Sequence, residues 1–134
     1  MSSTASLPLV IALSKGRPLS QLLSLLEQLG IQPTDDMTTS RKLVFETNQP
    51  EIRLMVFRGH DVATYVEHGI ADLGIVGKDV LLEFQGDGFY EPLDLKMSQC
   101  QMMVAGLVKE GNLPRRLRVA TKFVETAKRH YADK

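Results

Sequence analysis

The sequence predicts an α/β protein built on a largely parallel sheet. Two observations carry this prediction. Short apolar runs of strand length alternate along the chain with segments whose apolar residues repeat at helical spacing. The connections between them are short and contain Gly, Pro and Asn, and neither an internal repeat nor a low-complexity tract interrupts the alternation.

The first strand and the first helix form the clearest pair. Residues 9–13 (LVIAL) are a continuous apolar run, which is typical of a strand covered on both faces. The period then becomes helical, with an apolar stripe at Leu19, Leu22, Leu23, Leu26 and Leu29. Pro18 suits the first helical turn because it lacks an N–H, and Gly30 suits the left-handed position after the last turn. Residues 14–17 are therefore expected to form a tight strand-to-helix turn.

The later elements continue the alternation. A helix is expected at 60–69, with Asp61 as its N-cap and Gly69 after its end. We expect strands at 42–47, 52–58, 71–77, 101–108 and 115–121. We also expect helices at 78–85 and 122–132, and an extended segment at 90–95.

The predicted organisation places a boundary where two extended runs follow one another without a helix between them. It comprises a disordered lead at 1–7, a first α/β lobe at 8–95, a crossover strand and hinge at 96–114, and the start of a second lobe at 115–134. One strand and one helix bury too little surface for a core of their own. We therefore expect the second lobe to be incomplete within these 134 residues.

Composition narrows the classes of function. Lys+Arg and Asp+Glu balance at 16 each, so no overall charge indicates nucleic acid or an anionic membrane, and any anion site must be local. Cys100 is the single cysteine, which excludes an internal disulfide and indicates a reducing compartment, and we expect it to be a small buried side chain. No apolar stretch approaches the length of a membrane span, and residues 1–6 lack the features of a signal peptide. We therefore expect a cytoplasmic protein with no nucleic-acid or membrane partner.

Several familiar catalytic and cofactor motifs do not occur in the sequence. Gly69, Gly74 and Gly77 lack the G-x-G-x-x-G spacing. The pair formed by Gly77 and Lys78 lacks the first glycine and the following hydroxyl of a Walker motif. The histidines and the cysteine show no metal-ligand spacing, so no protein metal ligand is predicted.

Basic residues stand at the ends of the predicted elements. Six of them flank strands in this way: Lys15, Arg17, Arg41, Lys42, Arg58 and Lys78. Taken singly, each is an ordinary solvated charge. Ligands of open α/β sheets, however, gather at the carboxyl ends of parallel strands, where a helix N-terminus also directs free N–H groups outward. If these cations converge there, they suit the oxygens of a phosphate or a polyanion.

Four segments carry a resemblance to a known family. They are ALSKGR at 12–17, SRKLVFETN at 40–48, DVATYVEHGIADLGIVGKDVLLE at 61–83 and LDLKMSQCQMMVAG at 93–106. In this order and spacing, the chain resembles the catalytic subunit of ATP phosphoribosyltransferase, in particular its short form. The resemblance implies a lobe like that of a type II periplasmic binding protein, with the beginning of a second lobe and with the substrates bound between the lobes.

The resemblance also implies a reaction and partners. ATP and phosphoribosyl pyrophosphate would be joined to give phosphoribosyl-ATP and pyrophosphate, the first step of histidine biosynthesis, with Mg²⁺ accompanying the substrate phosphates. N1 of adenine would attack the anomeric carbon directly, which requires positioning and charge neutralisation but no enzyme nucleophile. A regulatory subunit resembling histidyl-tRNA synthetase and self-association into a homo-oligomer are implied as well.

The family's site maps onto the basic residues and their surroundings. Two arginines would grip the phosphates and the departing pyrophosphate and are the catalytic candidates, Arg17 and Arg41. The other residues would bind substrate: Lys15, Gly16, Lys42, Arg58, Asp72, Gly74, Gly77 and Lys78.

One feature of the family is not found in this sequence. A loop of pattern D/E-x-V-x-[ST]-G-x-T holds the 5′-phosphate of phosphoribosyl pyrophosphate in the family, and no such pattern occurs in these 134 residues. Two alternatives to the enzyme therefore stay open. The chain could be a non-catalytic fragment of this fold that binds a nucleotide or an anion, or a remnant with neither activity nor tight binding.

Overall fold

The computed structural model describes residues 7–108 and 111–132. The chain divides into two compact units, Met1–Asp94 and Leu95–Lys134, and this division falls one residue before the predicted end of the first lobe. Most of the predicted lead at 1–7 lies outside the described residues, as do positions 109–110 of the predicted hinge and the last two residues of the predicted second lobe.

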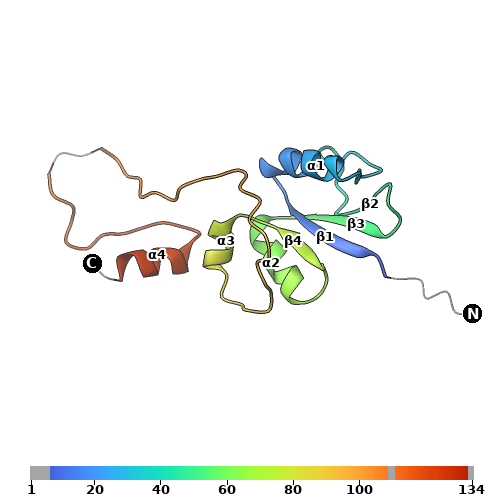
Figure 1. The fold of residues 1–134 in the computed structure, drawn as a ribbon. Coiled ribbons are helices and arrows are strands. Elements are labelled where there is room, and N and C mark those ends of the chain that lie inside the picture. Colours follow the sequence, from blue (N-terminus) through green and yellow to red (C-terminus); the bar gives the residue numbers. More distant parts are fainter. Residues whose placement is uncertain (1–6, 109–110, 133–134) are drawn as a thin grey trace, which may run out of the picture. The chain divides into compact units, whose positions relative to one another are not determined.

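The first unit is a four-stranded sheet with helices on both faces (Figure 1). Its strands are β1 (Leu9–Ser14), β2 (Val44–Glu46), β3 (Ile52–Phe57) and β4 (Leu73–Ile75). The order across the sheet is β2-β3-β1-β4. β1 pairs in parallel with both β3 and β4, whereas β2 runs antiparallel to β3 at the outer edge. The predicted α/β sheet is therefore confirmed, with one antiparallel strand added to a parallel centre.

One face of the sheet is covered by α1 (Pro18–Gln28), which follows β1. Three leucines of the predicted stripe are buried: Leu19, Leu22 and Leu26. Alternation along the strands directs Ile11, Leu13, Leu54 and Val56 to one and the same face, and all four side chains are buried. Pro18 stands in the first turn and Gly30 has a φ of +77°, so both predicted helix boundaries are confirmed.

The other face is covered by α2 (Gly59–Glu67). Ala12, Phe57, Val62 and Ala71 form the buried cluster between this helix and the sheet, and the rings of Phe57 and Tyr65 stack with centroids 4.1 Å apart. The helix lies so close to β4 that a Cβ at Gly74 would stand 2.7 Å from Val62 Cγ1 and 2.8 Å from Val66 Cγ2. Glycine at position 74 is thus required by packing.

Several predicted boundaries differ from those observed. The N-cap of α2 is Arg58 rather than Asp61, which stands in the first turn, so the predicted cap is wrong. The helix predicted at 78–85 is α3 (Lys78–Glu83). Residues 84–95 then have no regular structure, and they include the extended segment predicted at 90–95. β2 and β4 are each three residues long, shorter than predicted, because only those residues have a partner strand in register.

The second unit contains one helix in its described part, α4 (Val124–Tyr131). The strands predicted at 101–108 and 115–121 are wrong, since neither segment pairs with a neighbouring strand. Their side chains are exposed, including Met103 at 76% and Leu107 at 83%. Cys100 is also exposed, contrary to expectation. An apolar run needs a pairing partner and a covering layer to become a buried strand, and the described part of this unit supplies neither.

Candidate functional site

The strand order creates a switch point in the first unit. The connection that leaves β1 through α1 leads to β3 on one side, and the connection from β3 through α2 returns past β1 to β4 on the other. In such sheets a crevice opens beyond the carboxyl ends of the strands where the order reverses. By this rule, the ligand position expected in this sheet lies beyond the ends of β1 and β4.

Direct hydrogen bonds tie the three parallel strands together at this edge. The buried hydroxyl of Ser14 donates to the carbonyl oxygen of Ile75 at 2.8 Å. The N–H of Lys15 donates to the carbonyl oxygen of Phe57 at 2.7 Å. The residues that follow β1, β3 and β4 therefore emerge side by side. This edge, formed by residues 15–17, 40–42, 58–59 and 76–78, is called the carboxyl edge below.

The turn between β1 and α1 contributes Lys15 and Arg17. It is shaped by Gly16, whose φ of +110° is a conformation that L side chains rarely adopt, although a side chain would meet no atom within 4 Å. Arg17 is the N-cap of α1 and its side chain makes no capping hydrogen bond. Lys15 and Arg17 are both exposed at the start of this helix, where Pro18 has no N–H and the N–H of Leu19 donates to the carbonyl oxygen of Gly16 at 3.1 Å.

The loop that carries Arg41 and Lys42 reaches the same edge from the antiparallel strand. The N–H of Val56 donates to the carbonyl oxygen of Leu43 at 3.0 Å, so the start of β2 lies beside the end of β3. Because neighbouring strands are about 4.8 Å apart, Leu43 stands roughly two strand spacings from β1. The turn at 15–17 and the loop at 40–42 thus leave the sheet at one edge, separated by β3.

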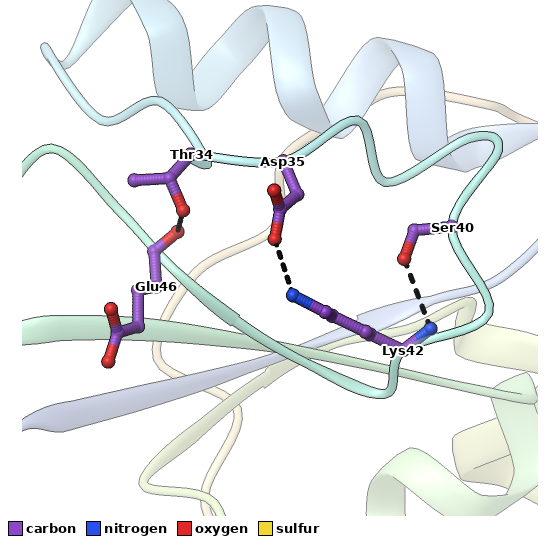
Figure 2. A network of polar contacts seen from close by, with 5 residues as sticks. All are labelled: Thr34, Asp35, Ser40, Lys42 and Glu46. Atoms are coloured by element: carbon purple, nitrogen blue, oxygen red, sulfur yellow. Dashed lines mark hydrogen bonds and ion pairs between the residues drawn. The ribbon is translucent and has the colours of Figure 1, made fainter.

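Lys42 is held to the outer side of this edge (Figure 2). Its Nζ lies 2.8 Å from Asp35 Oδ2, and its N–H donates to the Ser40 hydroxyl at 3.2 Å. The hydrogen bond and the negative charge of Asp35, followed by the charge of Glu46, raise the pKa of Lys42. A polar hollow of about 410 Å³ lies beside this pair, and it is lined by Thr34, Asp35, Lys42, Val44, Glu46 and Arg53.

Arg58 and Lys78 stand at the ends of the other two strands. Arg58 follows β3 directly and is exposed. Lys78 opens α3, and its Nζ lies 2.8 Å and 2.9 Å from the two carboxylate oxygens of Glu91. Gly77 is the exposed, extended residue that joins β4 to this helix. Arg58 and Lys78 thereby complete the row of cations along the carboxyl edge.

The cations of this edge fall into two groups. Within residues 7–108 and 111–132, four of them make no side-chain hydrogen bond or ion pair: Lys15, Arg17, Arg41 and Arg58. Lys42 and Lys78 are instead paired with carboxylates. The acids in the first turns of α2 and α3 contact neighbouring residues. Asp61 Oδ1 lies 3.6 Å from His60 Nε2, and Asp79 Oδ1 accepts from the N–H of Val80 at 2.9 Å. The edge therefore offers unpaired guanidinium groups to an incoming anion.

Two predicted residues are not brought to this edge. Asp72 lies at the amino end of β4, where its Oδ2 accepts from the N–H of Val10 and its own N–H donates to the carbonyl oxygen of Val10, both at 2.9 Å. Gly74 lies in the middle of β4 beneath α2. In this structure Asp72 completes the backbone pairing of β1, and Gly74 allows the close approach of the helix.

Three residues that hold the carboxyl edge in place were not predicted from the sequence. Ser14 joins β1 to β4, and Asp35 and Glu91 each hold a lysine. Ser14 bears a local signal, a hydroxyl at the end of an apolar strand. The two carboxylates pair across 7 and 13 residues of irregular loop, for which the sequence offers no periodic signal.

The described residues contain no cluster of three or more His, Cys, Asp and Glu side chains able to hold a metal ion. No helix in the described part is long and apolar enough to cross a membrane.

Comparison with known proteins identifies the family. The sequence model of ATP phosphoribosyltransferase matches residues 58–134. The ATP phosphoribosyltransferase of Pseudomonas putida strain F1 is 57% identical over 125 residues, which are 93% of this chain and 59% of that protein. The enzyme of Hahella chejuensis is 56% identical over 126 residues, 94% of this chain and 60% of that protein. The chain thus spans about three fifths of the length of these relatives.

A solved structure gives the same result. The ATP phosphoribosyl transferase (HisG:HisZ) complex from Thermotoga maritima contains a chain that is 31% identical, with a TM-score of 0.50, over 64% of this chain and 41% of that one. The family match covers more than half of the sequence and includes β4 and the turn that carries Lys78. The chain belongs to the ATP phosphoribosyltransferase family.

Proposed function

We propose that the carboxyl edge of the first unit is the phosphate-binding part of an ATP phosphoribosyltransferase active site. The reaction joins ATP to phosphoribosyl pyrophosphate and releases pyrophosphate, the first step of histidine biosynthesis. The observation that carries the proposal is the register of three strands. β1 and β3 are parallel and β2 is antiparallel to β3, so the end of β1, the end of β3 and the start of β2 bring four unpaired cations to one edge of the sheet. The lobe would then be of the type II periplasmic-binding-protein kind.

The chemistry of this reaction suits such an edge. N1 of adenine attacks the anomeric carbon of the ribose as the bond from that carbon to the pyrophosphate oxygen breaks. Negative charge grows on the departing pyrophosphate, and positioned arginines stabilise it. Arg17 and Arg41 would make these contacts, supported by Lys15 and Lys42. Gly16 would let the backbone of its turn approach the phosphates.

The nucleotide would contact the residues that follow β3 and β4. These are Arg58, Gly77 and Lys78, and the two strands flank β1 on either side. Asp72 and Gly74 act on this part of the site through the strand, because Asp72 pairs with the β1 backbone and Gly74 sets the distance between β4 and α2. We therefore propose that Arg58, Gly77 and Lys78 contact the substrate, and that Asp72 and Gly74 keep the strand that carries this part of the site in place.

Mg²⁺ would enter with the substrate. This ion keeps several waters and usually binds through substrate phosphates and one or two carboxylates rather than in a cage of protein ligands. The described residues fit that mode, since they offer cations for the phosphates and no cluster of metal ligands. When bound, Mg²⁺ supplies further neutralisation of the pyrophosphate charge.

The proposal extends to partners and location. The Thermotoga maritima neighbour was solved as a HisG:HisZ complex. We propose that proteins of the type to which this chain belongs bind a regulatory subunit resembling histidyl-tRNA synthetase, self-associate and act in the cytoplasm.

A second function is favoured by one observation of the sequence. The loop that holds the 5′-phosphate of phosphoribosyl pyrophosphate in the family does not occur in these 134 residues. A chain with the edge described above and without that loop would bind a nucleotide or pyrophosphate without turnover.

Calorimetry and a turnover assay separate the two functions. ATP, pyrophosphate and phosphoribosyl pyrophosphate are titrated in turn into the 134-residue chain with Mg²⁺, and phosphoribosyl-ATP is measured by chromatography. Formation of phosphoribosyl-ATP supports the enzyme, and binding of ATP and pyrophosphate without product supports the binding function. The absence of heat with every ligand would contradict both.

A further inference from the structure

We propose that Glu91 is a resident counter-ion of the anion site, which occupies Lys78 and sets how strongly the carboxyl edge attracts a polyphosphate. This inference rests on the proposed function, because it takes the carboxyl edge to be the phosphate-binding part. Both oxygens of the Glu91 carboxylate lie within hydrogen-bond distance of Lys78 Nζ, at 2.8 Å and 2.9 Å.

A folded loop brings Glu91 back to the edge. After α3 ends, the rings of Phe84 and Phe89 pack against each other with centroids 5.5 Å apart. Between them, Gly86 and Gly88 lie against the side chain of Glu67 on α2. The loop is therefore anchored on its own aromatic pair and on the neighbouring helix, and its end presents Glu91 to Lys78.

The pair is exposed, so folding stability does not explain it. The side chains of Lys78 and Glu91 are 64% and 46% exposed. Ion pairs with this exposure contribute little to folding because water competes for both charges. Their effect on an anion bound at the carboxyl edge is larger, because Lys78 itself belongs to that edge and Glu91 is paired with it.

The hydrogen bonds of the Lys78 ammonium group explain how Glu91 would weaken the binding of a phosphate. A lysine has three N–H donors, and the two oxygens of Glu91 engage it from one side. A phosphate that approaches Lys78 therefore meets an engaged donor group and a carboxylate that repels it. The four unpaired cations of the edge carry no such counter-ion. Glu91 thus makes the β4 side of the edge attract a polyphosphate less strongly than the β1 side does.

Lys42 provides an internal comparison. It is also paired with a carboxylate, Asp35, but that pair lies over the polar hollow beside β2, at the outer side of the sheet. The Lys78 pair instead stands next to the switch point between β1 and β4. Of the two carboxylates, Glu91 is therefore the one placed to act on a ligand beyond the ends of β1 and β4.

The test compares two variants with the same change in net charge. Glu91→Gln removes the charge beside Lys78 and keeps the length of the side chain. Glu51→Gln removes a charge at the other end of the sheet, where the carbonyl oxygen of Glu51 accepts from the N–H of Leu9. Pyrophosphate is titrated calorimetrically into the wild-type chain and both variants, at low salt and at about 0.5 M salt, where surface charges are screened.

We expect Glu91→Gln to lower the dissociation constant for pyrophosphate about three- to tenfold at low salt, the scale of one charge acting on a polyanion at short range in water. Glu51→Gln should stay within about 1.5-fold of the wild type, and the gain of Glu91→Gln should shrink at high salt. Circular dichroism and thermal unfolding should be unchanged in both variants.

The outcomes separate this inference from the proposed function. Equal or weaker pyrophosphate binding by Glu91→Gln, with a wild type that binds, overturns the role of Glu91 alone. If the higher pyrophosphate affinity of Glu91→Gln were undiminished at high salt, the role of Glu91 as a counter-ion would also be overturned, because the cause would then be structural. A wild type that does not bind pyrophosphate overturns the proposed function as well.

Discussion

Polar groups have different roles at the amino and carboxyl edges of the central sheet. At the amino edge, polar groups complete the backbone pairing of the strands. Asp72 accepts the N–H of Val10 at 2.9 Å, and the carbonyl oxygen of Glu51 accepts the N–H of Leu9 at 2.7 Å. At the carboxyl edge the backbone is already paired between the strands, and Arg17 and Arg58 extend into solvent without partners among the described residues.

This difference shows how a protein without net charge can hold a local anion site. Acidic and basic residues balance over the whole chain at 16 each. Parallel strands, however, bring their carboxyl ends to one edge, so residues far apart in sequence, such as Lys15 and Arg58, become neighbours there. Binding should therefore respond to changes at the carboxyl edge, and stability to changes at the amino edge and beneath the helices.

The largest effect is expected from the arginines of the carboxyl edge. Arg17→Ala and Arg41→Ala should each weaken pyrophosphate binding by about 1.5–3 kcal/mol, the scale of a hydrogen bond to a charged group, or roughly 10- to 150-fold in the dissociation constant. Calorimetric titration measures the change. The matched control is Arg115→Ala, which removes an exposed arginine of the second unit. An Arg115→Ala loss as large as that of Arg17→Ala would show that overall charge governs binding.

The next effect concerns Gly74 and separates packing from ligand contact. Gly74→Ala places a Cβ 2.7 Å from Val62 Cγ1, so it should lower the free energy of unfolding by about 1–3 kcal/mol, as overpacking does. Urea unfolding measures the change. Gly59→Ala is the control, because its Cβ would stand an ordinary 3.6 Å from Val80 Cγ2 at the first residue of α2.

Pyrophosphate affinity of the folded Gly74→Ala protein should stay within about twofold of the wild type. If the affinity instead fell tenfold while the unfolding free energy stayed the same, Gly74 would belong to the ligand site itself.

A smaller effect is expected at the amino edge. Asp72→Ala removes the acceptor of the Val10 N–H, and it should cost about 0.5–1 kcal/mol of unfolding free energy because this hydrogen bond is exposed to water. Asp72→Asn retains an acceptor oxygen and should recover most of the loss. Neither variant should change pyrophosphate affinity more than about twofold, and a larger loss of affinity with unchanged stability would place Asp72 in the binding site.

The smallest effect concerns the loop that carries Arg41. The Thr38 hydroxyl and N–H donate to Asp36 at 2.6 Å and 2.8 Å and lower the pKa of that carboxyl below 3.8. A depressed pKa contributes stability that is present at pH values above 3.8 and is lost as the pH falls through the folded-state value. Thr38→Val should therefore destabilise the chain slightly at neutral pH, and the difference should shrink in acid.

Thr34→Val is the control for this pH dependence. Its hydroxyl donates to the carbonyl oxygen of Glu46 at 3.2 Å, a neutral pair, so its destabilisation should not vary with pH. Urea unfolding at neutral pH and near pH 3 distinguishes the two (the same pH trend in both variants would contradict the role of Asp36).

The parts of the fold that sequence predicted are those with a local signal. The apolar run of β1, the leucine stripe of α1 and the glycine after its end each depend on neighbouring residues, and each is observed. The positions of Lys15, Arg58 and Lys78 at strand ends could be predicted for the same reason, because these residues stand directly after or one residue beyond apolar runs.

The predictions that were wrong or missing concern residues whose structure depends on partners distant in sequence. Residues 101–108 are as apolar as β1, but in the described structure no strand pairs with them. The counter-ions Asp35 and Glu91 lie in loops whose course is set by tertiary contacts, such as the packing of Phe84 against Phe89. Asp72 is close in sequence to Lys78 and yet belongs to the opposite edge, since a strand runs between them.

The central claim is that polyphosphates bind at the carboxyl edge. The most direct test is a ¹H–¹⁵N NMR titration of the 134-residue chain with pyrophosphate, which reports on every backbone N–H. The largest shifts should fall at residues 15–17, 40–42, 58–59 and 76–78, with the amides of Val10, Glu51 and Asp72 nearly unmoved. Shifts that cluster at the amino edge, or that are spread evenly over the exposed lysines and arginines, would contradict the claim.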